Sequence, residues 1–330
     1  MSCQGDSNYS VPRQTMHKAQ KMKSPAPGPV SVLRLGLCCQ FAARPIKFRT
    51  TTATALAKFP RREQLSRLAA LSAANAESLF AALQFCAADG IGSFRIASPI
   101  LPIKTHPTVG YRVDELPGSE EIVAQFRRCG EFASAHGIRT GFHPDQFVVL
   151  NSPNTEIVAR SIADIESQAE IAEWTNADTV NIHGGGGYGD KPAALERFRR
   201  NLDLLSPRAR SRLTVENDDK TFTPSDLFHL CRIEGVPLVY DVHHHRCLPD
   251  DLNLEQATVA ARATWNREPL FHLSSPLEGW SGPKPERHHD YIDPKDFPAV
   301  WRGLAITVEV EAKAKELAVD RLKCYLDGTE

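Results

Sequence analysis

The sequence predicts an α/β fold, a single (β/α)8 TIM-type barrel with its active site at the C-terminal ends of the strands. Eight short apolar runs alternate with longer segments of helical periodicity, and no linker or change of composition follows residue 30. A barrel of this type takes about 250 residues plus insertions, which suits the 330-residue chain. The runs cover residues 32–38, 93–96, 140–143, 179–183, 213–216, 238–241, 270–272 and 305–311.

The segments between the runs carry helical signals. Apolar residues recur at three- and four-residue spacing, which predicts that one face of each helix packs against the barrel. The two clearest stripes are Leu65, Leu68, Leu71, Leu79 and Leu83, and Ile157, Ile162, Ile165 and Ile171. Helices are expected to start at Ser119, which precedes two glutamates, at Asn154, and at Thr223 followed by Pro224. Residues 312–330 are expected to form a charged C-terminal helix.

Residues 31–330 are therefore expected to form one barrel domain, and residues 1–30 a disordered basic tail. The tail has four basic residues against one acid and no apolar stretch, so it is not a secretory signal. A start codon assigned too far upstream explains these residues equally well. The eight cysteines form no CxxC pair, which indicates free thiols in a reducing compartment, the cytoplasm.

The composition excludes two classes of protein. The net charge of -1 argues against a purely electrostatic nucleic-acid binder, which needs a clear cationic excess. No run approaches the roughly 18 apolar residues of a membrane span, so no membrane association is expected. With 42% hydrophobic residues the chain can bury a large core.

Six consecutive apolar runs end in His, Asp or Glu. These residues are His143, His183, Glu216, Asp241, His272 and the pair Glu309 and Glu311, with His243, His244 and His245 directly after the sixth run. In a barrel the C-terminal strand ends converge on one mouth, so the side chains are expected to gather there.

Imidazole and carboxylate groups are the ligands of Zn²⁺, Mn²⁺ and similar ions. A lone histidine at a strand end is usually structural, but six such positions in register would crowd unpaired charges together without ions. The number of ligands exceeds the needs of one ion and predicts two or three divalent ions that share carboxylates. Mn²⁺ is the expected ion, with Zn²⁺ and Mg²⁺ as alternatives. Such clusters suit phosphoryl chemistry, because they activate water and neutralise the attacking and leaving oxygens.

A glycine-rich run at residues 184–189 follows His183 directly. It lacks the Gly-Lys-Ser/Thr ending of a nucleotide-binding loop. We interpret it as a tight loop whose missing side chains let a substrate backbone approach the metal site.

Short segments carry a resemblance to a known family. They include Gly141-Phe-His-Pro-Asp-Gln-Phe, Asn181-Ile-His-Gly-Gly-Gly-Gly-Tyr, Thr214-Val-Glu-Asn-Asp-Asp, Val239-Tyr-Asp-Val-His-His-His, Phe271-His-Leu-Ser-Ser-Pro and His289-Asp-Tyr-Ile-Asp. In this order, over nearly all of residues 31–315, the chain resembles the UV damage endonucleases, barrel nucleases related to endonuclease IV-type AP endonucleases.

The resemblance implies a set of site residues. The implied metal ligands are His143, His183, Glu216, Asp241, His244, His272, His289 and Glu311. Glu216 would be the bridging and catalytic carboxylate, and His106 a further catalytic histidine. Of the pair His288 and His289, the second aligns, because Asp290 and Tyr291 follow it.

The resemblance also implies an activity on DNA. Members of the family nick UV-damaged double-stranded DNA 5′ to the photoproduct, leaving a 3′-hydroxyl and a 5′-phosphate, and also act on some abasic or distorted sites. Gln146 matches a residue that enters the duplex, Phe147 stands for a usual Tyr, and Tyr188 is expected to contact DNA as well. We expect a monomer without an obligate protein partner, in the cytoplasm of a bacterium.

The chain also departs from the family. Leu37 and Phe41 stand where members carry a Tyr and an Asn that touch the lesion strand. Leu270 stands where some members have a carboxylated lysine, and Glu309 adds a carboxylate two residues before Glu311. The DNA groove is expected to be lined by basic residues, namely Arg44, Lys47, Arg49, Lys58, Arg61 and Arg62.

Three alternatives remain open from the sequence. An AP-site endonuclease would use the same cluster on a different lesion. A metal-dependent sugar isomerase or epimerase would use the same barrel with fewer ions and a closed pocket. A non-catalytic damage-binding protein would not need to keep so many ligands.

Overall fold

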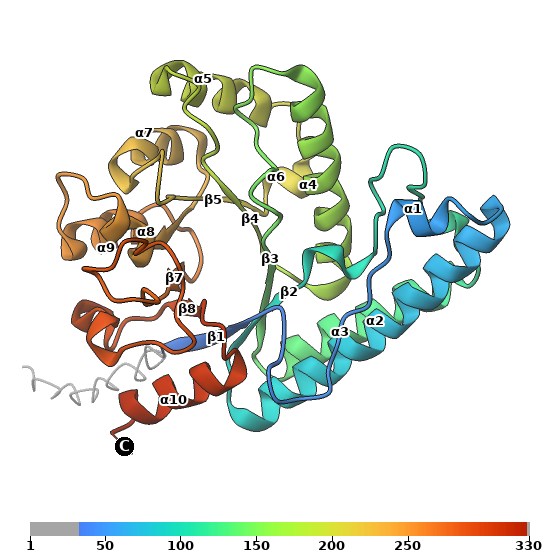
Figure 1. Ribbon diagram of the computed structural model, residues 1–330, viewed down its shortest axis with the longest axis horizontal. Coiled ribbons are helices and arrows are strands. Elements are labelled where there is room, and N and C mark those ends of the chain that lie inside the picture. The colour runs from blue at the N-terminus through green and yellow to red at the C-terminus, as the bar shows by residue number, and fades with distance from the viewer. Residues whose placement is uncertain (1–32, 329–330) are drawn as a thin grey trace, which may run out of the picture. The chain divides into compact units, whose positions relative to one another are not determined.

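The predicted barrel is confirmed by a computed structural model that describes residues 33–328 (Figure 1). Its eight strands are parallel and close in sequence order, with β1 paired to β8. The strands are β1 (Arg34–Cys38), β2 (Ser93–Ile96), β3 (Arg139–Phe142), β4 (Thr179–His183), β5 (Leu213–Glu216), β6 (Leu238–Asp241), β7 (Leu270–Leu273) and β8 (Thr307–Val310). The predicted tail, residues 1–30, lies outside the described residues.

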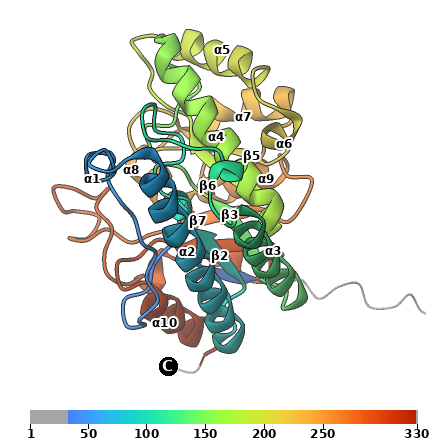
Figure 2. The ribbon, with the colours of Figure 1, turned by 90° about the vertical axis from the view of Figure 1, so that its right-hand side faces the viewer.

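Helices surround the barrel (Figures 1 and 2). They are α1 (Ala53–Leu56), α2 (Arg61–Asp89), α3 (Ser119–Ala135), α4 (Thr155–Thr175), α5 (Lys191–Leu202), α6 (Pro207–Arg210), α7 (Pro224–Glu234), α8 (Val242–Cys247), α9 (Leu254–Arg262) and α10 (Glu316–Leu326). Four short 3₁₀ turns, Ser98–Ile100, Val113–Glu115, Pro294–Asp296 and Ala299–Trp301, lie in the connections. The long helices α2 and α3 pack side by side, and α10 packs against β1.

All three expected helix starts are confirmed, and two of them have the expected cap. The side chain of Asn154 accepts a hydrogen bond from Glu156 N at the start of α4. Thr223 and Asp226 form a reciprocal capping box at the start of α7. The third helix, α3, also starts at Ser119, but this serine is its first residue and not its cap. Gly118 precedes it at φ 72°, a left-handed conformation that glycine adopts without a Cβ clash, and supplies no side-chain cap.

The core lies between the strands and the helices. In the first predicted stripe, Leu68, Leu79 and Leu83 lie on the buried face of α2 and are fully buried. In the second, Ile165 and Ile171 are buried but Ile157 is 38% exposed and lines a cavity at the barrel mouth. None of the seven cysteines among the described residues forms a disulfide. Within residues 33–328 we find no helix of the length and apolar character needed to cross a membrane.

Candidate metal and nucleic-acid site

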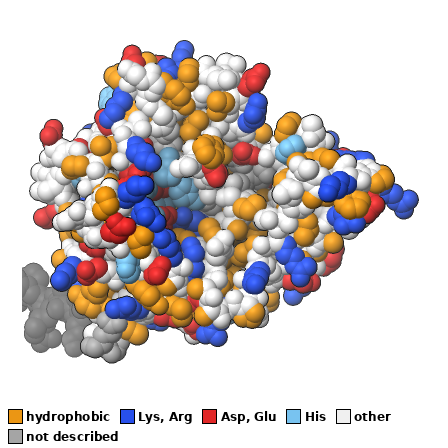
Figure 3. Space-filling model, viewed as in Figure 1, with side chains coloured by type: hydrophobic (Ala, Val, Ile, Leu, Met, Phe, Trp, Pro, Cys, Tyr) orange, Lys and Arg blue, Asp and Glu red, His pale blue; other side chains and the backbone are white. Residues whose placement is uncertain are grey.

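A cavity of about 760 Å³ opens at the mouth of the barrel. In the space-filling view, histidine side chains gather in a hollow near the centre of one face, with Lys and Arg side chains along one side of it (Figure 3). The imidazole and carboxylate groups that line the cavity include those of His143, His183, Glu216, His244, His288 and Glu311. These six residues lie at the ends of different strands or in the segments that follow them, as expected for an active site of this fold.

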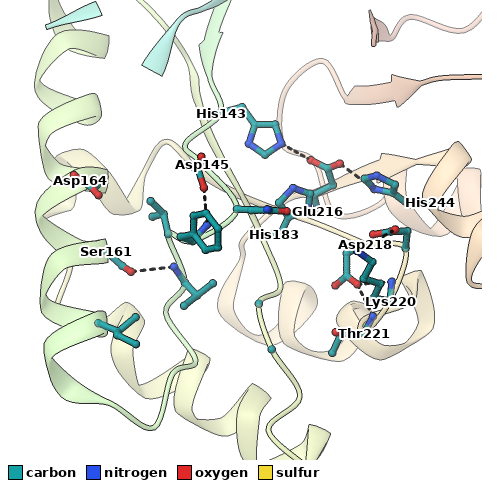
Figure 4. A pocket seen from close by; sticks show the side chains of 18 of the residues that line it. His143, Asp145, Ser161, Asp164, His183, Glu216, Asp218, Lys220, Thr221 and His244 are labelled. Atoms are coloured by element: carbon teal, nitrogen blue, oxygen red, sulfur yellow. Dashed lines mark hydrogen bonds and ion pairs between the residues drawn. The ribbon is translucent and has the colours of Figure 1, made fainter. Parts of the chain in front are cut away.

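Glu216, the last residue of β5, lies at the centre of the cluster (Figure 4). Its Oε2 is 3.0 Å from His143 Nε2, and its Oε1 is 3.1 Å from His272 Nδ1 and 3.4 Å from His244 Nδ1. Asn181, on the adjacent strand β4, donates from Nδ2 to Glu216 Oε2 at 2.5 Å. One fully buried carboxylate therefore faces three imidazole rings and is held by one amide.

Asp241 ends β6 and shapes the segment that follows. Its Oδ1 accepts from His244 N at 2.8 Å, so it is the N-cap of the short helix α8. Because a helix turns about 100° per residue, the three consecutive histidines point in different directions. His244 faces Glu216, His245 Nδ1 contacts the Tyr240 hydroxyl at 2.8 Å, and the ring of His243 packs against Trp280.

A second group of charges lies where β2, β7 and β8 meet. Arg95 in β2 forms ion pairs with Glu309 at 2.5 Å and with Glu311 at 2.6 Å. His272 in β7 lies between the two sets of charges, with Nδ1 toward Glu216 and Nε2 3.3 Å from Glu309 Oε2. Both Arg95 and Glu309 are buried in the barrel interior.

The cluster shifts the pKa values of its members strongly. Burial alone would raise the pKa of Glu216, but His272, His183 and His143 lower it well below its usual range. Burial would lower the pKa of His272, yet the Glu216 carboxylate raises it to about 10. Burial would raise the pKa of Glu309, and Arg95 with His272 brings it down to about 2. Protonated imidazoles thus balance the carboxylates, a role that bound cations can take over.

The buried groups fit divalent cations. Three sets of donors lie close enough together to hold an ion: His143, His272 and Glu311; His143, His183 and Glu216; and Glu216, Asp241 and His244. Four buried atoms of these residues have no hydrogen-bond partner: His183 Nδ1, Glu216 Oε1, Asp241 Oδ2 and His272 Nδ1. Unpartnered buried polar atoms are costly, and cation binding would satisfy them. Mixed imidazole and carboxylate donors suit Mn²⁺ and Zn²⁺.

The structure brings seven of the eight expected ligands together and leaves His289 apart. His289 Nδ1 accepts from Tyr291 N at 3.0 Å within its own loop. The neighbouring His288 lines the mouth cavity instead, with Nδ1 3.8 Å from Glu311 Oε2. Adjacent residues of an extended segment point to opposite sides, so only one of the two histidines can face the cluster.

His106 also lies apart from the cluster. Its Nδ1 accepts from the backbone N–H groups of Thr108 and Val109. His106 lines neither the mouth cavity nor a second cavity beside it. Leu37 is fully buried, whereas Phe41 packs against Phe85 and Phe94 and lines this second cavity of about 870 Å³. The two cavities share His143, Asp145, Val148 and Asp164.

Two exposed aromatic side chains line the mouth cavity. Gln146 and Phe147 lie in an exposed turn, where Asp145 Oδ1 accepts from Phe147 N at 3.0 Å, and Phe147 is 76% exposed. Tyr188 is 50% exposed in the glycine-rich loop, with the Arg197 guanidinium 5.5 Å from its ring centre. Both rings are free to stack on bases or sugars.

Asn151 fixes the glycine-rich loop. Its Nδ2 donates to the carbonyl oxygens of Gly184 and Gly186 at 2.7 and 2.8 Å. Gly185 has φ 86°, and a Cβ there would lie 2.3 Å from Asn151 Oδ1. Glycine at this position therefore lets the loop pass close to Asn151.

Basic residues lie at both cavities. Arg160 and Lys220 line the mouth cavity, and Lys47 and Lys104 line the second one. Of the six basic residues expected along a DNA groove, only Lys47 lines either cavity in the described part of the chain. Arg61, for example, pairs with Glu115 at 3.1 Å.

Three functional positions were not identified from the sequence: the contacts of Arg95, the Asn181 amide beneath Glu216, and the orientation of His288. Arg95 and Asn181 lie in short apolar strands, and side chains two positions apart in a strand share one face. Asn181 is two residues before His183, so this alternation could have placed its amide on the same face as that histidine. No sequence signal fixes the orientation of His288.

Comparison with known proteins gives a consistent result. The model of the family described as UV-endonuclease UvdE matches residues 33–330. The chain is 34% identical over 300 residues to the UV DNA damage endonuclease of Bacillus velezensis, covering 86% of this chain and 89% of the relative.

Solved structures with a similar fold include SacUVDE, which by its name is an endonuclease of the same kind. The crystal structure of SacUVDE superimposes with a TM-score of 0.81 at 25% identity, covering 90% of this chain and 99% of that one. Endonuclease IV from Thermus thermophilus superimposes with a TM-score of 0.59 at 16% identity, covering 89% and 99% of the two chains. The second likeness concerns the fold alone.

Proposed function

We propose that this chain, which belongs to the UV-endonuclease UvdE family, cuts DNA 5′ to UV photoproducts with the help of divalent ions. The chain is a DNA-repair endonuclease. The observation that carries the metal dependence is the buried cluster around Glu216. Four imidazoles and two further carboxylates gather there, and four buried atoms of the cluster have no hydrogen-bond partner. Sugar isomerases share the barrel, but the family match favours the nuclease.

The residues that would hold the ions are those of the three donor sets, with His288 in place of His289. The chemistry that bound divalent ions supply is the activation of water and the neutralisation of charge on a phosphate. Glu216 belongs to two of the three sets, so it is the residue suited to join two ion sites. Asn181 keeps the Glu216 carboxylate in one orientation through its hydrogen bond to Oε2.

The other residues of the mouth would bind the DNA. Arg160 and Lys220 would attract phosphates at the edge of the cavity. Gln146 and Phe147 would enter the duplex beside the lesion, and Tyr188 would stack from the glycine-rich loop. Damaged DNA unstacks and bends at lower cost than intact DNA, which gives the enzyme a basis for selecting lesions.

The test is a nicking assay with purified protein and Mn²⁺ on UV-irradiated and undamaged supercoiled plasmid. Nicking limited to irradiated plasmid is the expected result, with ends that carry a 3′-hydroxyl and a 5′-phosphate. Equal nicking of both plasmids would contradict damage selectivity. Retention of irradiated plasmid without nicking would instead indicate a damage-binding protein.

A duplex oligonucleotide with one abasic site distinguishes the AP-endonuclease alternative. We propose that cleavage of the photoproduct substrate exceeds cleavage of the abasic one, and the reverse order would favour the alternative. We also propose that the enzyme acts as a monomer in the bacterial cytoplasm, where its DNA substrate lies.

A further inference from the structure

Below the cluster, a buried ion pair contacts one of its histidines from the side away from the mouth. We infer that Glu309 and Arg95 form a positioning pair that holds the His272 ring with Nδ1 directed into the cluster. The inference rests on the proposed function, because it assumes that His272 binds an ion. It assigns a role to Glu309 that is distinct from that of a metal ligand.

The strand register places Glu309 beside His272. β7 and β8 are paired so that His272 lies opposite Glu309, and the two side chains share the interior face. On the other side of β8, Gly36 of the neighbouring strand β1 also lies opposite Glu309. A Cβ on Gly36 would come within 3.0 Å of Glu309 Cγ, so the glycine leaves room for this carboxylate inside the barrel.

Glu309 does not reach the mouth. It is buried, lines neither cavity, and belongs to none of the three donor sets. Its Oε2 accepts from Arg95 Nε at 2.6 Å and lies 2.5 Å from the second guanidinium nitrogen, Nη2. With its oxygen engaged by Arg95, Glu309 is placed to support a ligand and not to bind an ion.

The two nitrogens of His272 face opposite surroundings. Nδ1 lies 3.1 Å from Glu216 Oε1 and 3.5 Å from Glu311 Oε1, and it has no hydrogen-bond partner. Nε2 lies 3.3 Å from Glu309 Oε2 and 3.0 Å from Arg95 Nη2. The ring is therefore contacted at Nε2 by the buried ion pair, while Nδ1 faces the cluster.

Arg95 contacts the ring directly as well as through Glu309. Its Nη2 group is hydrogen-bonded to His272 Nε2 at 3.0 Å and forms ion pairs with both Glu309 and Glu311. The buried ion pair therefore holds the ring at Nε2 and leaves Nδ1 directed toward Glu216 and Glu311.

Carboxylates that orient metal-bound histidines typically change metal affinity by about 10- to 100-fold. Glu309→Met removes the acceptor at similar volume, and Glu309→Gln keeps an oxygen acceptor without the charge. We expect Glu309→Met to weaken Mn²⁺ binding about 10- to 100-fold, and Glu309→Gln to weaken it less. Binding is measured on the full chain by calorimetry and by electron paramagnetic resonance of free Mn²⁺.

The matched control is the Arg34–Glu268 pair at the other end of the barrel, joined at 2.9 Å. Glu268→Met should leave Mn²⁺ affinity unchanged, although it also removes the carboxylate partner of an arginine. Should Glu309→Met fail to fold because Arg95 loses this one of its two carboxylate partners, the double variant Arg95→Met, Glu309→Met removes both charges. We expect that variant to fold and to bind Mn²⁺ weakly.

A direct readout uses the wild-type chain loaded with diamagnetic Zn²⁺ and ¹⁵N-labelled at histidine. A long-range ¹H–¹⁵N spectrum should show metal coordination through Nδ1 of His272. Coordination through Nε2, or wild-type Mn²⁺ affinity in Glu309→Met, would overturn the inference while leaving the proposed function intact. Failure of the wild-type chain to bind Mn²⁺ at all would overturn both.

Discussion

The ring of His288 faces the carboxylate of Glu311, with Nδ1 3.8 Å from Oε2, while the ring of the adjacent His289 turns back to its own loop. The segment is extended at this point, and His288 forms an isolated antiparallel bridge with Pro276. Alternation along extended backbone therefore assigns one histidine to the mouth and the other to the loop. Sequence alignment of two adjacent histidines cannot make this distinction.

This geometry separates two otherwise similar variants. His288→Ala should weaken Mn²⁺ binding and reduce nicking of irradiated plasmid by at least about 10-fold, because it removes a donor beside Glu311. His289→Ala should bind Mn²⁺ like the wild type, since its ring lies outside the cluster. Calorimetric titration of both variants is the measurement, and a loss confined to His289→Ala would contradict the assignment.

Glu216→Gln should abolish cleavage, with a fall in rate of at least about 100-fold, because a neutral amide cannot balance the cations of two donor sets. The variant is of nearly the same size and should stay folded by circular dichroism. Glu166→Gln is the matched control, because Glu166 accepts from Ser206 outside the site and should leave nicking unchanged. Normal nicking by Glu216→Gln would refute its bridging role.

Removal of metal should stop the reaction and lower stability. Treatment with EDTA should abolish nicking, and added Mn²⁺ should restore it. Ions that bind only the folded chain stabilise it by about 2.7 kcal/mol at 100 times the dissociation constant, which corresponds to a rise in Tm of roughly 5 °C. Differential scanning calorimetry with and without Mn²⁺ measures this rise. An unchanged Tm at saturating Mn²⁺ would speak against the buried ion sites.

The pKa of His272 predicts a pH dependence of the metal-free chain. That pKa is raised from an ordinary value of about 6.5 to about 10, because the Glu216 carboxylate outweighs burial. The protonated ring thus stabilises the fold fully below about pH 6.5, and this contribution is lost as pH rises through about 10. In EDTA, Tm should fall across this range more steeply for the wild type than for His272→Gln. Equal slopes would contradict the prediction.

Phe147 and Tyr188 should contribute to DNA binding without contributing to stability. Each base stacked on an aromatic ring is worth about 1–3 kcal/mol, so Phe147→Ala should weaken binding to UV-damaged duplex by roughly 5- to 100-fold. Phe147→Tyr should retain it, because the ring remains. Fluorescence anisotropy with a labelled duplex measures the affinity, and Ile233→Ala, at an exposed apolar residue outside both cavities, is the control. If Ile233→Ala weakened DNA binding as much as Phe147→Ala does, the result would contradict a stacking role for Phe147.

Much of the fold could be predicted from the sequence because parallel strands buried on both faces are nearly continuous apolar runs. The runs expected at residues 93–96, 213–216 and 238–241 have the same bounds as β2, β5 and β6. Ser119 shows the limit of local signals. A serine before two glutamates resembles a cap, but the left-handed Gly118 sets the start of α3.

The site was predictable where strand ends position the side chain. His143, His183, Glu216, Asp241 and His272 follow from the convergence of strands at the barrel mouth. Positions set by loops were less predictable. His106 and His289 lie in connecting segments whose turns direct them away from the cluster. The role of Arg95 depends on contacts across the barrel, with Glu309 some two hundred residues later in the chain.

The closure of the barrel by β8 against β1 has a consequence for the order of events during protein synthesis. Glu311 follows β8, and it meets partners made much earlier, Arg95 among them. A ribosome translates from the N-terminus, so the nascent polypeptide cannot complete its cutting centre until almost all of it has been synthesised. An unfinished chain that lacks Glu311 therefore lacks one donor of the set formed with His143 and His272.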